Sequence, residues 1–201
     1  MQGSNVKNIT VVGHSYVRRL KEYRESHIRR PQFLSVNGHR FRLSYVYRGG
    51  KDYSFYNQSH AYKLRILEKN PDIAIIILGG NKVCGQEPVP TISEQMRIFH
   101  AWLREALPNS LIITAEVEPR YSYNPLLPHD HIGESYAERR SAFNQAVKRM
   151  RDKDHMLRLA TTLCDSYYFT WNGVHLRDAG NEIYWKALVG CLESAFEKGL
   201  M

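Results

Sequence analysis

The fold is decided by residues 9–16, ITVVGHSY. The first four residues favour a β-strand, a glycine follows, and residues 16–26 have the pattern of a helix. In a parallel sheet flanked by helices, ligands bind at the carboxyl ends of the strands. Ser15 therefore lies where a nucleophile is useful, with its hydroxyl at a helix N-terminus. Serine is also a preferred helix N-cap, and this purely structural role is the alternative for Ser15.

Strands and helices alternate along the rest of the chain. Residues 73–78, IAIIIL, form an unbroken apolar run that is typical of a central parallel strand covered on both faces. Residues 33–37 are too short and mixed to assign. The other expected elements are strands at 41–47, 111–117 and 156–160, and helices at 55–69, 93–107, 134–151 and 178–197. This alternation predicts a three-layer α/β/α sandwich with a five-stranded parallel sheet.

Length and composition favour a single domain, residues 1–201. With 201 residues, 43% of them hydrophobic, the chain can bury one sizeable core. There is no run of about 18 apolar residues and no charged-then-apolar leader, so we expect an intracellular, cytoplasmic protein without a membrane span. Cys84, Cys164 and Cys191 are odd in number and widely spaced, which fits a reducing compartment.

The sequence gives little support for a metal or a cofactor, and we expect neither. The nearest approach to a metal-ligand cluster is HDH at residues 129–131, in a Pro-rich loop with no further ligands close by.

The basic residues are concentrated at one end of the chain. The net charge is +8, and residues 1–51 hold 11 Lys and Arg against 2 Asp and Glu. These side chains either form a face that attracts phosphate or an acidic substrate, or are scattered in solvent. No zinc finger or RNA-binding signature supports a nucleic-acid reader. The candidates for such a face are Arg18, Arg19, Lys21, Arg24, Arg29, Arg30, Arg40, Arg42 and Arg48.

Four short motifs occur in order along the chain. GHS at 13–15, GG at 49–50 and GGN at 79–81 end the first three predicted strands, and NGVH at 172–175 precedes the last helix. Together they resemble the blocks of the SGNH (GDSL-like) hydrolase superfamily, which run Gly-Asp-Ser, a glycine after the second strand, Gly-x-Asn, and Asp-x-x-His. The resemblance covers nearly the whole chain. A looser one, based on the basic excess, EPR at 118–120 and the length, is to esterase-type domains of non-LTR retroelement and related invertebrate proteins.

The superfamily resemblance implies a flavodoxin-like sheet and a serine esterase that cleaves a small-molecule carboxylic ester through an acyl-enzyme. Ser15 would be the nucleophile and His175 the base that takes its proton. The resemblance implies an oxyanion hole formed by the backbone N–H groups of Ser15 and Gly50 and the side-chain amide of Asn81. Gly49 is the alternative to Gly50, because the sequence does not fix the register of the turn.

The triad acid position departs from the family pattern, because it holds Asn172 instead of aspartate. Its spacing lets the side-chain oxygen accept from Nδ1 of His175, but a neutral amide does not stabilise the imidazolium that forms during attack. Some members of the superfamily are understood to work with a serine and a histidine alone. Asp165 and Asp178 are possible substitutes, although no spacing favours either.

Two further departures concern the pocket. His14 replaces the aspartate that usually stands beside the nucleophile, so it either reshapes the pocket or adds a second titrating group. Lys82 follows Asn81 where aspartate is common, and it either favours an anionic substrate or points to water. Asn172 and His14 keep open the alternative of a binding module of this fold with weakened or lost catalysis. The basic N-terminal segment keeps open a nucleic-acid accessory role.

Overall fold

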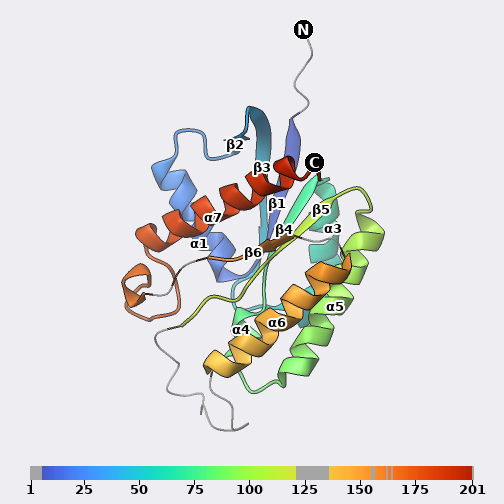
Figure 1. Ribbon diagram of the computed structural model, residues 1–201, viewed down its shortest axis with the longest axis vertical. Helices are drawn as coiled ribbons and strands as arrows, with labels where there is room; N and C mark the ends of the chain where they lie inside the picture. Colours follow the sequence, from blue (N-terminus) through green and yellow to red (C-terminus); the bar gives the residue numbers. More distant parts are fainter. Residues whose placement is uncertain (1–5, 121–135, 155–156, 162, 164, 201) are drawn as a thin grey trace.

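The computed structural model describes residues 6–120, 136–154, 157–161, 163 and 165–200 (Figure 1). Cys164, the HDH sequence at 129–131 and the expected first residues of the helix at 134–151 lie outside this part of the chain.

Six strands among the described residues form one sheet, in the order β2-β3-β1-β4-β5-β6. Five of them run parallel, and β2 runs antiparallel to β3 at the edge. The predicted parallel sheet is confirmed, and the unassigned residues 33–37 supply the extra edge strand. The strands are β1 Lys7–Gly13, β2 Phe33–Val36, β3 His39–Tyr47, β4 Ile73–Ile77, β5 Leu111–Ala115 and β6 Leu157–Leu159.

Helices cover both faces of this sheet, as Figure 1 shows, which completes the predicted three layers. Helices α1 and α7 pack on one face, and α2, α3, α5 and α6 contribute to the core on the other. The helices are α1 Ser15–His27, α2 Tyr53–Gln58, α3 His60–Glu68, α4 Gly80–Val83, α5 Val89–Ala106, α6 Tyr136–Asp154 and α7 Asp178–Glu197, and a short 3-10 helix, η1, spans Ser166–Tyr168.

Strand β4 lies at the centre because both of its faces are apolar. Ile73, Ile75 and Ile77 pack under α1 and α7, while Ala74 and Ile76 face the opposite layer. Successive side chains of a strand point to opposite faces, so an unbroken apolar run can be buried on both sides.

Two helical predictions need correction. The single helix expected at 55–69 is divided into α2 and α3, because the backbone of Ser59 is extended (φ −88°, ψ 95°). The short helix α4 follows β4 directly, where only a turn was expected.

Within the part of the chain that the structure covers, every helix is too short or too polar to cross a membrane.

The end of β1 is tightly packed, and this fixes where α1 begins. A Cβ atom on Gly13 would lie 2.3 Å from the carbonyl oxygen of Ile77 and 2.6 Å from the side chain of Val17. Only glycine fits where β1, β4 and α1 meet so closely. The next two residues, His14 and Ser15, therefore lie at the carboxyl edge of the sheet.

Candidate active site

Ser15 is the first residue of α1, and His14 is its N-cap. The side chain of His14 accepts a hydrogen bond from the backbone N–H of Tyr16, with 3.4 Å between Nδ1 and N. The alternative that Ser15 serves as the N-cap is therefore wrong. The hydroxyl of Ser15 is left for other contacts at the positive end of the helix.

Ser15 and His175 are 160 residues apart in sequence and meet in space. The Oγ atom of Ser15 lies 3.1 Å from Nε2 of His175, and both side chains are half-buried. Tyr16 supports the contact between Ser15 and His175, because its hydroxyl donates to the backbone carbonyl of Val174. The segment before α7 is thereby held against the start of α1.

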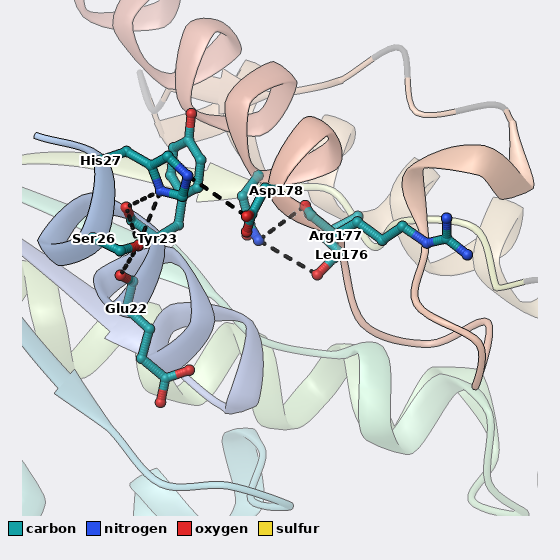
Figure 2. A network of polar contacts seen from close by, with 8 residues as sticks. Glu22, Tyr23, Ser26, His27, Leu176, Arg177 and Asp178 are labelled. Carbon is teal, nitrogen blue, oxygen red and sulfur yellow. Dashed lines mark hydrogen bonds and ion pairs between the residues drawn. The ribbon is translucent and has the colours of Figure 1, made fainter.

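Helices α1 and α7 are tied together beyond this pair as well, as Figure 2 shows. Nε2 of His27, near the end of α1, lies 3.6 Å from a carboxylate oxygen of Asp178, the first residue of α7. Within α7, the side chain of Asn181 donates to the backbone carbonyl of the N-cap residue Arg177 at 3.1 Å, which holds the start of this helix. Nearby, the guanidinium of Arg24 lies 4.0 Å from the ring centre of Trp185. The two helices that flank the Ser15–His175 pair are thus fixed relative to each other.

Asn172 contacts His175, but not in the expected orientation. Its side-chain oxygen accepts from the backbone N–H groups of Val174 and His175, at 3.0 and 3.1 Å, and from the hydroxyl of Thr170 at 2.7 Å. Its side-chain nitrogen lies 3.1 Å from Nδ1 of His175. The prediction that the amide oxygen accepts from Nδ1 is therefore wrong, because the local turn already uses that oxygen as its acceptor.

The orientation of Asn172 determines the tautomer of His175. An amide NH₂ group can only donate, so Nδ1 of His175 must be the acceptor in this contact. A neutral imidazole then carries its proton on Nε2, which donates to the hydroxyl of Ser15. A general base needs the opposite tautomer, with Nε2 free to take the serine proton.

The surroundings of His175 keep its imidazole neutral. Burial, and then the positive charges of Arg19, Arg120 and Arg18, lower its pKa to about 4. Both effects disfavour the charged ring. At neutral pH His175 is therefore unprotonated and available as a base once its tautomer allows it.

Of the expected oxyanion-hole residues, Ser15 begins α1, Asn81 lies in the short helix α4, and Gly50 lies in a turn close to Asn81. Gly50 has a φ of +69°, within a turn closed by a hydrogen bond from the N–H of Lys51 to the carbonyl of Arg48. Glycine is favoured there because other residues rarely adopt a positive φ. Gly49 is not among the residues with positive φ. The side-chain nitrogen of Asn81 lies 3.4 Å from the carbonyl of Lys51, next to Gly50.

Arg120, which was noted only as part of the sequence EPR, sets the orientation of Asn81. Its guanidinium donates to the side-chain oxygen of Asn81 at 3.3 Å and to Sγ of Cys84 at 2.8 Å. With its oxygen engaged by Arg120, Asn81 keeps its NH₂ group on the side of the Gly50 turn. A preorganised amide donor is what a developing oxyanion requires.

Asp52 is a site residue that the sequence analysis missed. It is 2% exposed, and its carboxylate accepts from the backbone N–H groups of Tyr53 at 2.9 Å, Gly79 at 2.6 Å and Lys82 at 3.2 Å. Burial raises its pKa to about 6, against these hydrogen bonds. Asp52 thereby joins the segment that follows Gly50 to the backbone on either side of Asn81. The available signal in the sequence was that Asp52 directly precedes Tyr53, the first residue of a helix, because aspartate is a preferred N-cap.

A narrow pocket is lined in part by His14, Gly80, Glu118, Arg120 and Tyr184, and its lining includes the two neighbours of Ser15 in the chain but not Ser15 itself. Burial, followed by the charges of Arg120 and His175, lowers the pKa of His14 to about 3. His14 therefore shapes the pocket as a neutral side chain and does not titrate near neutral pH. Burial raises the pKa of Glu118 to about 7.

The remaining charged candidates have other partners. Lys82 forms an ion pair with Glu87 at 2.7 Å. Asp165 accepts from the N–H of Tyr167, and Asp178 faces His27, so neither replaces Asn172 at Nδ1 of His175.

The basic N-terminal residues do not all lie free in solvent. Arg24 is 3% exposed under Trp185, Arg18 pairs with Glu22, Lys21 pairs with Glu25, and Arg40 lies over the ring of Phe33. Over the described residues, no three His, Cys, Asp or Glu side chains gather as a metal site would require.

The fold is that of the SGNH (GDSL-like) hydrolases. No family model matches the sequence, and no curated protein matches it, so this similarity is one of structure. A putative acylhydrolase from Bacteroides fragilis superposes with a TM-score of 0.71 at 12% identity, covering 99% of this chain and 90% of that one.

Two other solved structures are similar to this chain. A GDSL-like lipase from Bacteroides thetaiotaomicron gives a TM-score of 0.68 at 11% identity, covering 98% and 92% of the two chains. The psychrotrophic esterase EstA from Pseudoalteromonas, in a structure inhibited by monoethylphosphonate, gives 0.64 at 11% identity, covering 95% and 99%.

Proposed function

We propose that this chain is a serine hydrolase that cleaves carboxylic esters, with Ser15 as the nucleophile and His175 as the base. The observation that carries the proposal is the 3.1 Å distance between Oγ of Ser15 and Nε2 of His175, which is within hydrogen-bond reach. The similar structures are those of a putative acylhydrolase, a GDSL-like lipase and an esterase, which supports the same chemistry for this chain.

The proposed reaction has two steps. Oγ of Ser15 attacks the ester carbonyl while its proton passes to Nε2 of His175, and the alcohol leaves with that proton. Water then attacks the acyl-enzyme and gives a proton to His175. The acid is released as His175 returns this proton to Oγ of Ser15. The N–H groups of Ser15 and Gly50 and the amide of Asn81 are the proposed donors to the oxyanion. Neither step requires a cofactor.

Before attack, His175 must change tautomer. The proton has to move from Nε2 to Nδ1, where it would meet the NH₂ group of Asn172 instead of an acceptor. Rotating the amide would break its contacts with the N–H groups of Val174 and His175. We therefore expect a slow enzyme.

The test is labelling with a fluorophosphonate, together with turnover of a short-chain aryl ester. The wild-type protein should be labelled and should hydrolyse the ester, and Ser15→Ala should do neither. Ser44→Ala is a matched control, because Ser44 bonds to Thr10 on strand β1 within the sheet. Equal labelling of the wild type and Ser15→Ala would remove Ser15 from the mechanism.

The second candidate function is a binding module of the same fold with little or no catalysis. The contact between the NH₂ group of Asn172 and Nδ1 of His175 favours it, because this contact stabilises the inactive tautomer. Asn172→Asp separates the two functions. A large gain in turnover indicates a weakened catalyst, and the absence of turnover and labelling in both forms favours the binding module.

A further inference from the structure

We infer that the ester cleaved at Ser15 carries a negative charge close to the scissile bond, and that Arg19 is the residue that selects it. This inference rests on the proposed function. It names the substrate class for the same site.

Arg19 is placed beside the proposed nucleophile by helix geometry. It lies four residues after Ser15 on α1, and residues at this spacing share one face of a helix. Helical side chains lean toward the N-terminus of the helix, which here is the end that carries Ser15. Arg19 is half-buried, and its Nε atom is buried without a hydrogen-bond partner among the described residues. The Arg19 guanidinium is also among the charges that lower the pKa of His175, so it lies within electrostatic range of the proposed base.

Arg120 adds a second positive charge on the Asn81 side of the site. Within the described part of the chain, its guanidinium donates to the amide oxygen of Asn81 and to the thiol of Cys84, both neutral groups. Arg18, by contrast, lies 3.6 Å from Glu22. The three charges that act on His175 all come from these arginines.

The carboxylates near the site have other partners. Asp52 is held by three backbone N–H groups, Glu118 accepts from the hydroxyl of Thr161, and Glu87 pairs with Lys82. Asp178 faces His27. None of these contacts involves Arg19 or Arg120.

Over the described residues, no carboxylate forms an ion pair with Arg19 or Arg120, and an anionic substrate would supply a negative charge for them. His175 becomes an imidazolium as it takes the serine proton, and the arginines repel that positive charge. In a triad an aspartate offsets it, but Asn172 is neutral. A negative group on the substrate, bound between Arg19 and the reacting ester, would stabilise the imidazolium and improve binding at the same time.

The test compares three acetate esters that differ in charge: 4-acetoxybenzoate, its neutral methyl ester, and 4-acetoxyphenyltrimethylammonium. Each kcat/KM is divided by the rate of hydroxide hydrolysis, which corrects for the leaving group. We expect the anionic ester to be preferred over the neutral one by about tenfold at low salt, with the cationic ester slowest, and the preference to shrink as salt is added. The series is measured in the wild type and in Asn172→Asp, which we expect to be faster.

Variants of Arg19 locate the effect. Arg19→Gln should remove most of the preference for the anionic ester, while Arg19→Lys, which keeps the charge, should retain part of it. The matched control is Arg65→Gln, because Arg65 lies in the last turn of α3, toward the amino end of β4 and away from the site. It should leave the preference unchanged.

The outcomes separate this inference from the proposed function. If all three esters are cleaved at equal corrected rates, or if Arg19→Gln folds and keeps the full preference, the inference is overturned and the esterase stands. If no ester is cleaved and no fluorophosphonate labelling occurs in the wild type or in Asn172→Asp, both fail.

Discussion

The two halves of the candidate site are built differently. In the half that carries Ser15, Gly50 and Asn81, buried Asp52 holds the segment after Gly50 to the start of α4, because it accepts hydrogen bonds from the backbone N–H groups of Tyr53, Gly79 and Lys82. The half that carries His175 depends on a short turn in which Asn172 uses its oxygen for the backbone and turns its NH₂ group to the imidazole. Under the proposed function the first half would supply the donors to the oxyanion, whereas the second stabilises the tautomer of His175 that cannot accept the serine proton. We therefore expect the base half to limit the rate.

The largest expected effect is a gain from Asn172→Asp. The aspartate can keep one oxygen on the backbone N–H groups and present the other to Nδ1 of His175, which then carries the proton. Because the reverse change costs about 10⁴ in turnover in serine proteases, we expect kcat to rise by up to about that factor. Steady-state hydrolysis of an aryl acetate measures it.

The control is Asn172→Ala, which removes the amide without supplying an acceptor and should gain far less. Equal rates for the aspartate and asparagine forms would show that the tautomer does not limit catalysis.

The next effect tests the nucleophile half. Asn81→Ala should lower kcat by about 10²–10³, with a smaller change in KM, because an oxyanion donor acts mainly in the transition state. Lys82→Ala is the neighbouring control, since its charge is paired with Glu87, and it should stay close to wild type. A kcat for Asn81→Ala within a factor of two of wild type would exclude Asn81 from the oxyanion hole.

The structural role of Asp52 should be measurable in the free energy of unfolding. Asp52→Ala leaves three N–H groups without their acceptor and removes the cap of α2, so we expect about 3 kcal/mol of destabilisation. Asp165→Ala is the matched control, because Asp165 caps the short helix η1 at an exposed position. It should cost about 1 kcal/mol or less. Urea unfolding measures both, and equal losses would contradict the role given to Asp52.

The smallest effect concerns pH and the buried Glu118 beside the pocket. Burial raises its pKa from 4.5 to about 7, so the folded protein holds a proton that the unfolded chain has lost. The stability from this group is therefore fully present below pH 4.5 and is lost as the pH rises through 7. The free energy of unfolding of the wild type, relative to Glu118→Gln, should fall across that range.

The control for this pH effect is Glu105→Gln, at an exposed residue on α5. A constant difference in stability between the wild type and Glu118→Gln from pH 4.5 to 7 would contradict the burial of the charge.

Much of the fold could be predicted because apolar patterns report burial directly. The run at 73–78 is buried on both faces, and so it predicted the central strand. β2 could not be assigned because a four-residue edge strand buries only part of its surface, leaving a weak pattern: Leu34 and Val36 are buried, and Ser35 is exposed. The break at Ser59 depends on a single backbone conformation, which periodicity does not encode.

The site was predictable only at the level of which residues meet. The resemblance to the superfamily motifs implied that Ser15 and His175 would be close, and Oγ of Ser15 lies 3.1 Å from Nε2 of His175. The orientation of the Asn172 amide follows from competing donors in its turn, and the role of Asp52 follows from N–H groups contributed by a distant strand end. Such contacts depend on geometry that residue types do not specify.

The turn at Asn172 also affects how this protein ages. Asparagine before glycine loses ammonia when the glycine nitrogen attacks the side-chain carbonyl, and the product includes aspartate. Here the N–H of Gly173 is bonded to the carbonyl of Thr170 at 2.8 Å, and the Asn172 oxygen is bonded to two further N–H groups. The folded chain should therefore deamidate slowly at this position, while a sample stored unfolded and then refolded should contain a fraction with the missing acid restored.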